Sequence, residues 1–127
     1  MKEKPYNGGQ WTEARKNSFI KSALRNARWP VKYVALVNAR VGKRTNPETG
    51  RQAMFHKCAD CGGEFVAKEV VADHIVPVVL TTGFDSWDGV IDRLFCEVEG
   101  FQCLCKECHG VKTKAENAER RANAKAH

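Results

Sequence analysis

The sequence has 127 residues, of which 43% are hydrophobic, so it is long enough for one domain with a core of its own. No apolar run approaches the roughly 20 residues that span a bilayer, and the polar, basic N-terminus lacks the apolar segment of an export signal. We therefore expect a soluble protein of the cytoplasm, without a membrane partner and with reduced cysteines.

The net charge of +6 is unevenly distributed along the chain. Residues 1–57 carry 13 Lys or Arg against 3 Asp or Glu, residues 58–104 carry 2 against 9, and residues 105–127 carry 6 against 3. The basic ends favour a phosphate backbone as partner, and the acidic centre suits a divalent cation. The alternative interpretation is a solvated surface that keeps the protein soluble.

The chain is predicted to begin with a flexible arm, residues 1–10, followed by a basic amphipathic helix. Apolar residues recur at helical spacing after Thr12, with Lys and Arg between them. The Trp29-Pro30 pair would end this helix, because proline is not tolerated in a helix interior.

A second helix is predicted from about Val31 to Val41, and Gly42 would end it. Residues 43–51 are basic and rich in turn formers, which favours a linker or a loop that lies on a phosphate backbone. Residues 11–52 are therefore interpreted as a basic, helical N-terminal extension.

The remaining residues, 53–127, are predicted to form the main α+β part of a single compact domain. Residues from Met54 onward alternate between apolar and polar, as in strands. The predicted elements are two short strands between Phe65 and Val78, a helix over residues 86–96 with Ser86 as its N-cap, a strand over residues 100–105, and a helix from Lys106 to about Ala124.

Four of the six cysteines form two CxxC pairs, separated by 43 residues. These cysteines are Cys58, Cys61, Cys105 and Cys108. Two such pairs on tight turns complete a tetrahedral zinc site, and four protein ligands leave no position for substrate, so the zinc would be structural. The alternative is four buried thiols without a metal. Cys96 and Cys103, outside the pairs, are expected to pack in the core.

The segments CADCGGEF, VVADHIVPV, GFDSWDGVIDRLFC and FQCLCKECHGVKT, taken together, resemble the zinc-stapled HNH endonucleases that are common in bacteriophage genomes. The resemblance covers residues 55 to 114, nearly half of the chain. It implies a ββα-metal core in which one strand ends near Asp73-His74, a second strand covers Phe101 to Leu104, and the following helix carries His109.

The resemblance and the chemistry of phosphodiester hydrolysis assign roles to three residues. Hydrolysis needs a base to activate water and a cation to stabilise the charge that develops on the phosphate. His74 would be the general base, because a neutral imidazole titrates near pH 7. Asp73 and His109 would hold one divalent ion, Mg²⁺ or Mn²⁺. The alternative for His74 alone is a structural histidine.

The sequence departs from the family pattern at the motif asparagine, which falls at Gly100. In the family this asparagine braces the loop that holds the general base, so its absence leaves the orientation of His74 open. Glu97, Glu99 and Gln102 are possible substitutes. Thr113 stands where some relatives place a third metal-binding histidine, and a two-ligand site suits magnesium or manganese better than tightly held zinc.

Several basic residues are candidate DNA contacts, with solvated surface charge as the alternative for each. They are Lys112 and Lys114 near the expected active site, and Arg15, Lys21, Arg25 and Arg28 on the first helix. The three tryptophans could stack on bases, but core packing is the favoured interpretation.

The function implied by the resemblance is a metal-dependent HNH endonuclease that nicks or cuts DNA. Phage relatives often work beside the packaging machinery, so the large terminase subunit is an expected partner by resemblance alone. The alternative from another class is a zinc-ribbon nucleic-acid-binding module that has lost cleavage, which the glycine at position 100 keeps open.

Overall fold

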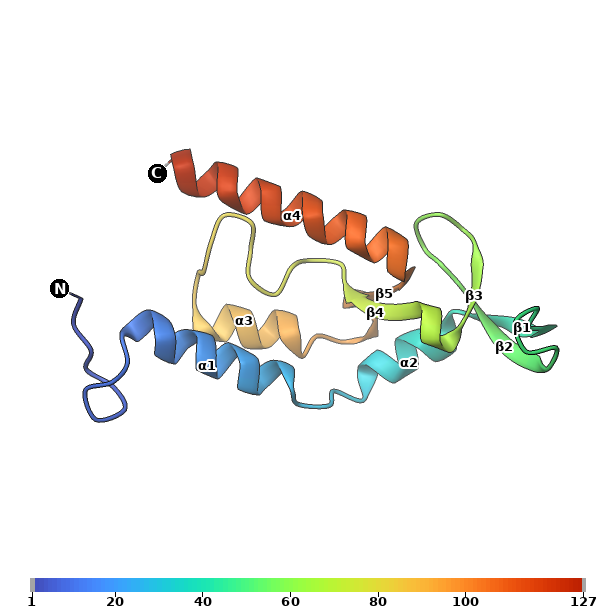
Figure 1. The fold of residues 1–127 in the computed structure, drawn as a ribbon, viewed down its shortest axis with the longest axis horizontal. Coiled ribbons are helices and arrows are strands. Elements are labelled where there is room, and N and C mark those ends of the chain that lie inside the picture. The colour runs from blue at the N-terminus through green and yellow to red at the C-terminus, as the bar shows by residue number, and fades with distance from the viewer. Residues whose placement is uncertain (1, 127) are drawn as a thin grey trace.

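The computed structural model describes residues 2–126, which form a mixed α+β fold with four α-helices and two small antiparallel sheets (Figure 1). In chain order the elements are α1 (Glu13–Arg25), α2 (Val31–Asn38), β1 (Arg40–Thr45), β2 (Gln52–Lys57), β3 (Glu64–Val66), β4 (Val70–His74), α3 (Trp87–Leu94), β5 (Phe101–Cys105) and α4 (Lys106–Ala126), with short 3₁₀ turns at Ala67–Glu69 and Val98–Gly100. Within this range no helix combines the length and apolar character needed to cross a membrane.

The first helix forms as its sequence predicts. The Oγ1 atom of Thr12 accepts a hydrogen bond from the backbone N–H of Arg15 at 3.2 Å, which caps the N-terminus of α1. The helix ends at Arg25, before the proline that was expected to stop it. Before it, Tyr6 and Trp11 close a tight turn through backbone hydrogen bonds.

The prediction for residues 39–45 was wrong, because β1 replaces the end of the second helix and the start of the predicted loop, whereas residues 46–51 form a turn as expected. α2 ends at Asn38, and β1 pairs antiparallel with β2 in a register that places Thr45 opposite Gln52. The turn is closed by hydrogen bonds from Asn46 N to Arg51 O and from Gly50 N to Asn46 O, both at 2.7 Å. Pairing with a strand beyond the turn decides the state of this segment, and its own apolar spacing could not reveal that.

A two-stranded sheet and the long helix after it form the centre of the molecule. β4 pairs antiparallel with β5, so that Asp73 lies opposite Gln102 and His74 lies opposite Phe101. α4 begins at the residue after β5 and runs along the outer side of the molecule (Figure 1). The predicted strand over 100–105 and the predicted C-terminal helix are both confirmed within one or two residues. Strand character after Phe65 is confirmed as β3 and β4, but it stops at His74 instead of continuing to Val78.

Two small clusters of buried residues stabilise the fold. One contains Cys58, Leu104 and Cys105, with Phe65 and Cys108 packed against it. The second contains Val78, Val90 and Leu94, with Leu24, Trp87 and Phe95 packed against it. α3 supplies the second cluster, and it begins at the predicted cap, since Ser86 Oγ accepts a hydrogen bond from Gly89 N at 3.0 Å.

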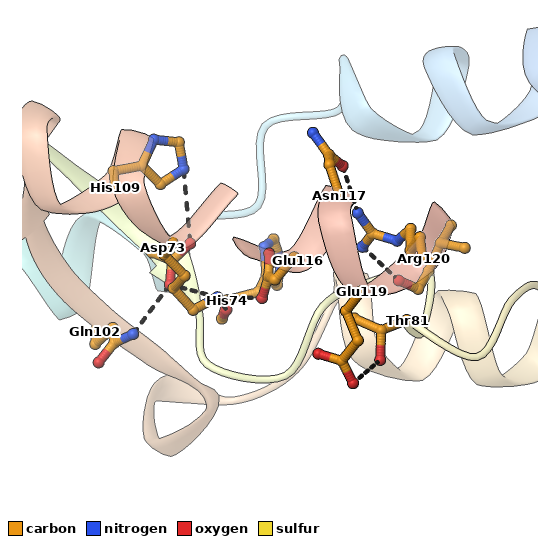
Figure 2. Close-up of polar contacts among 11 residues, drawn as sticks. Asp73, His74, Thr81, Gln102, His109, Glu116, Asn117, Glu119 and Arg120 are labelled. Atoms are coloured by element: carbon orange, nitrogen blue, oxygen red, sulfur yellow. Dashed lines mark hydrogen bonds and ion pairs between the residues drawn. The ribbon is translucent and has the colours of Figure 1, made fainter. Parts of the chain in front are cut away.

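The C-terminal half of α4 is fastened to the segment that follows β4. Arg120 Nη2 donates to Val79 O at 2.7 Å, and Asn123 Nδ2 donates to Thr81 O at 2.9 Å. Thr81 Oγ1 donates to Glu119 Oε1 at 3.0 Å (Figure 2). These bonds hold residues 79–81 against the helix, and they fix the path of the chain just after His74.

Candidate metal centre and active site

The four cysteines of the two CxxC pairs converge on one point, as predicted. Their sulfur atoms all lie within 4.8 Å of one another. Sulfurs about 2.3 Å from a tetrahedral zinc ion are roughly 3.8 Å apart, and the Cys61 and Cys105 sulfurs are 4.0 Å apart. The arrangement can bind a metal ion and is consistent with structural zinc. Among residues 2–126 it is the one group of three or more His, Cys, Asp or Glu donors close enough to share an ion.

Each cysteine pair is shaped by its local backbone. Cys58 and Cys61 follow β2 on a turn in which Gly62 N donates to Cys58 O and Gly62 adopts φ +74°, a conformation that side chains disfavour. Cys105 ends β5, and the N–H of Cys108, in the first turn of α4, donates to its sulfur at 3.4 Å. The centre therefore joins the β2–β3 loop to the start of α4.

The thiols of this centre have strongly divergent pKa values. Burial disfavours a charged Cys58, but backbone N–H groups around its sulfur, the first of them from Cys105, lower its pKa to about 6. The pKa of Cys108 is raised, chiefly because its thiol donates a hydrogen bond to the Cys105 sulfur. Several adjacent thiolates repel one another unless a cation lies between them, which is the chemistry of a metal-binding site.

The two remaining cysteines lie outside the cluster. Cys103 is buried in β5, and burial raises the pKa of its thiol. Cys96 is partly buried and packs against Gly100: a Cβ atom at Gly100 would lie 2.5 Å from the Cys96 sulfur. This contact gives a steric reason for glycine at the position where the family pattern has asparagine.

The carboxylate of Asp73 is buried and surrounded by three polar side chains (Figure 2). Gln102 Nε2 donates to Asp73 Oδ2 at 3.0 Å, Lys112 Nζ lies 3.1 Å from the same oxygen, and His109 Nε2 lies 3.6 Å from Oδ1. The structure thus brings Asp73 and His109 together. Gln102, considered as a substitute for the missing asparagine, contacts Asp73 instead of the His74 side of the strand.

His74 ends β4 and makes contacts that differ from those of Asp73, as expected for neighbours in a strand. Its Nε2 atom lies 3.0 Å from the carbonyl oxygen of Leu94, at the end of α3, and its ring lies 4.6 Å from that of Phe101. A carbonyl oxygen only accepts hydrogen bonds, so Nε2 carries the proton and Nδ1 is the acceptor of the neutral ring. Burial is the main cause that lowers the pKa of His74.

The loop after His74 is held by backbone groups. Ile75 N donates to Gly100 O at 2.9 Å, so the backbone of the glycine holds the residue next to His74. Glu97 and Glu99, the other two substitutes considered for the asparagine, are exposed. The position of His74 therefore follows from two main-chain carbonyls, those of Leu94 and Gly100.

Lys112 turns toward the protein, and its side chain is 24% exposed. Its Nζ atom lies 3.1 Å from Asp73 Oδ2, 3.0 Å from His74 O and 2.7 Å from Glu116 Oε2. Burial lowers the pKa of Lys112, but the carboxylates of Glu116 and Asp73 outweigh it and raise the pKa, which keeps the ammonium charged. Lys114 points to solvent on the same helix.

The basic residues predicted on the first helix lie at different places, and Arg28 lies beyond the end of α1, in the α1–α2 connection. Arg15 stacks on Trp11 with its guanidinium 4.5 Å from the ring centroid, and Lys21 lies 6.0 Å from the ring of Phe84. Arg25 and Arg28 line a cleft next to α2 and β4.

Two contacts of the site were not predicted, although one left a signal in the sequence. Lys112 and Glu116 are four residues apart on a helix, a spacing that places side chains side by side. The contact between His74 and Leu94 joins residues of different elements and has no local signal.

No protein-family model, curated protein or solved structure matches this chain.

Proposed function

We propose that this chain is a metal-dependent HNH endonuclease that hydrolyses phosphodiester bonds in DNA. The main supporting observation is the arrangement of three side chains at the end of β4: Asp73 faces His109, and the next residue, His74, is held by a main-chain carbonyl. These are the positions that the motif resemblance singles out. In this proposal the two strands β4 and β5 and the helix α4 form the ββα-metal core.

Asp73 and His109 are proposed to share a divalent ion. Two ligand atoms each about 2.1 Å from an octahedral ion are about 3.0 Å apart at adjacent positions, so ion binding would draw the two side chains closer than they lie here. Asp73 Oδ1 and His109 Nε2 are 3.6 Å apart, and neither Gln102 nor Lys112 contacts this oxygen, since both contact Oδ2. The carboxylate ligand suits Mg²⁺ or Mn²⁺. Such an ion would supply positive charge to the phosphate and the leaving oxygen.

His74 is proposed as the general base. Nδ1 would take the proton from the attacking water, while the Leu94 carbonyl keeps the proton on Nε2 and stabilises the imidazolium that forms. The lowered pKa of His74 keeps the ring neutral near pH 7, so the base is present in its reactive form.

The four-cysteine centre is proposed to hold zinc and to act as a structural support. It fixes the start of α4, which carries His109, to the loop before β3. Such rigid placement matters because small displacements of reacting groups are costly for catalysis.

DNA is the proposed substrate, with Lys114 and the basic residues of α1 as phosphate contacts. A phage origin and a large terminase subunit as partner are proposed on the resemblance alone.

A second candidate is a zinc-ribbon nucleic-acid-binding module without cleavage activity. The observation that favours it is the ion pair of Lys112 with Asp73, which places an ammonium on the carboxylate that a divalent ion would need. Glycine at position 100 favours it as well, since the motif asparagine is missing.

Conversion of supercoiled plasmid separates the two candidates. Wild type, His74→Ala and Asp73→Asn are compared with magnesium, manganese or excess EDTA. Asp88→Asn, at an exposed acid of α3, is the matched control. If the chain is an endonuclease, wild type and Asp88→Asn relax or linearise the plasmid when metal is present. Both site variants lack this activity, and EDTA abolishes it. A plasmid that all four proteins bind and leave supercoiled under every condition identifies the binding module.

A further inference from the structure

A basic cleft of about 710 Å³ lies between the C-terminal end of α1, the α1–α2 connection, α2 and β4. Its volume falls in the range of roughly 300–1,000 Å³ that is common for ligand sites. Three cationic side chains, Arg25, Arg28 and Lys32, line it together with the aromatic residues Trp29 and Tyr33. No Asp or Glu of the described chain is among its lining residues, so the cleft is electrostatically complementary to a polyanion.

The cleft opens beside the strand that carries His74. Ala72 lines the cleft and shares a strand face with His74, two residues further on. β4 pairs with β5, α2 packs against both strands, and Val71 and Ala72 of β4 line the cleft.

The two aromatic residues of the cleft differ in their surroundings: one is packed into the protein and the other is exposed. The indole of Trp29 donates to Cys96 O at 2.7 Å and belongs to the packing. Tyr33 is 63% exposed, and Arg40 Nη2 donates to its hydroxyl at 3.2 Å, which restrains the ring. An exposed, restrained aromatic ring beside several cations is the combination with which proteins bind unpaired bases.

A DNA duplex does not fit this combination. In a duplex both faces of each base are covered by neighbouring bases, so the Tyr33 ring has no base face to stack on. We propose that this cleft binds an unpaired nucleotide of a single DNA strand, with its cationic side chains on the phosphates and Tyr33 against the base.

This inference deepens the proposed function and partly rests on it, because it names the form of the substrate. A strand seated in the cleft continues along β4 toward His74. The preferred substrate is then DNA with a single-stranded segment, such as a gap, a flap or a frayed end, and intact duplex is a poorer one.

The test measures binding apart from cleavage. All variants are made in the full-length chain with His74→Ala, and no divalent ion is added, so bound DNA stays intact. Fluorescence anisotropy follows a labelled oligothymidylate of roughly 16 nucleotides, the upper end of single-strand site sizes, and a duplex of equal length. The cleft variants are Lys32→Ala, Tyr33→Ala and Tyr33→Phe. The matched controls are Lys125→Ala, at an exposed lysine near the end of α4, and Phe84→Ala, at an exposed aromatic residue outside the cleft.

We expect tighter binding of the single strand than of the duplex. Tyr33→Ala should weaken single-strand binding about tenfold, while Tyr33→Phe keeps it, because the ring does the stacking. Lys32→Ala should weaken it and lower the salt dependence by about 0.7 in the slope of log K against log salt. Equal affinity for both DNA forms, or cleft variants that bind like Lys125→Ala and Phe84→Ala, overturns the inference.

Failure of the proposed function is distinguishable from failure of this inference. A wild type that leaves both supercoiled plasmid and gapped DNA intact with every metal, with cleft variants that lose single-strand binding, refutes the nuclease and keeps the cleft. A wild type that cuts plasmid, with cleft variants that bind normally, keeps the nuclease and refutes the cleft.

Discussion

The Nε2 atom of His74, at the end of β4, lies 3.0 Å from the carbonyl oxygen of Leu94, at the end of α3. This contact fixes which ring nitrogen carries the proton. It also draws the imidazole into a half-buried position, where the neutral form is favoured over the charged one.

The first prediction is a pH dependence that follows from this position. The pKa of His74 is lowered from its usual 6.5, so the unfolded chain binds this proton more readily than the folded chain. The contribution of His74 to the free energy of unfolding is therefore present above pH 6.5 and decreases as the pH falls from there through the lowered pKa. Urea titrations from acid to neutral pH should show this loss in wild type and a smaller loss in His74→Gln.

The cleavage rate should also depend on the protonation of His74. Because His74 acts as a base only when neutral, the acidic limb of the pH–rate profile should lie below the usual histidine value and the rate should be level at pH 7. A rate that still rises steeply above pH 7 contradicts this assignment of the base.

The second prediction concerns the four-cysteine centre. Purified protein should contain one zinc ion per chain, and Cys105→Ala should lose both the metal and the cooperative unfolding transition, because structural zinc contributes on the order of 10 kcal/mol to folding. Cys96→Ala is the matched control, since its sulfur lies outside the cluster. Metal analysis with circular dichroism measures both quantities. Full zinc content in Cys105→Ala would show that this thiol is not a ligand.

The metal centre could be predicted from sequence because each pair of its ligands lies within a few residues of the chain. Two CxxC pairs specify ligand type and turn geometry within a few residues, and only their meeting depends on the fold. The same holds for α3, whose cap Ser86 precedes its apolar face directly. α4 was also predictable, from a long stretch of strong helix formers.

The features that could not be predicted depend on contacts between residues far apart in the sequence. β1 is a strand because β2 pairs with it after a turn, whereas Val41 continued the apolar spacing of the preceding helix and residues 43–45 suited a loop. The partners of Asp73 depend on the register that sets it opposite Gln102. Lys112 points inward because it forms ion pairs with two carboxylates, that of Glu116 on the same helix and that of Asp73 on β4.

The third prediction tests the steric role of Gly100. An added Cβ would lie 2.5 Å from the sulfur of Cys96, so Gly100→Ala should lower the free energy of unfolding by about 1–3 kcal/mol, as overpacking does. Cys96→Ala in the same chain should restore part of this loss, because it removes the sulfur. Urea unfolding of the two single variants and the double variant gives the coupling. Purely additive effects would place the cause elsewhere.

The fourth prediction concerns the competition between Lys112 and a divalent ion for Asp73. The ammonium lies 3.1 Å from Asp73 Oδ2 and is also held by Glu116, so an ion at Asp73 and His109 must bind beside a positive charge or displace it. Lys112→Met removes that charge and should tighten Mn²⁺ binding by about tenfold, since a hydrogen bond to a charged group is worth about 1.5–3 kcal/mol. Calorimetric titration of the zinc-loaded protein measures the affinity.

Lys114→Met is the matched control for this titration, because Lys114 is exposed on the same helix and loses the same charge. Its Mn²⁺ affinity should stay near that of wild type. Asp73→Asn, in contrast, should abolish the binding event in both backgrounds, which identifies the carboxylate as the ligand. If Lys112→Met binds Mn²⁺ as weakly as Lys114→Met, the ammonium does not compete with the ion. Lys112 then acts only as the link that joins β4 to α4 through Asp73, the His74 carbonyl and Glu116.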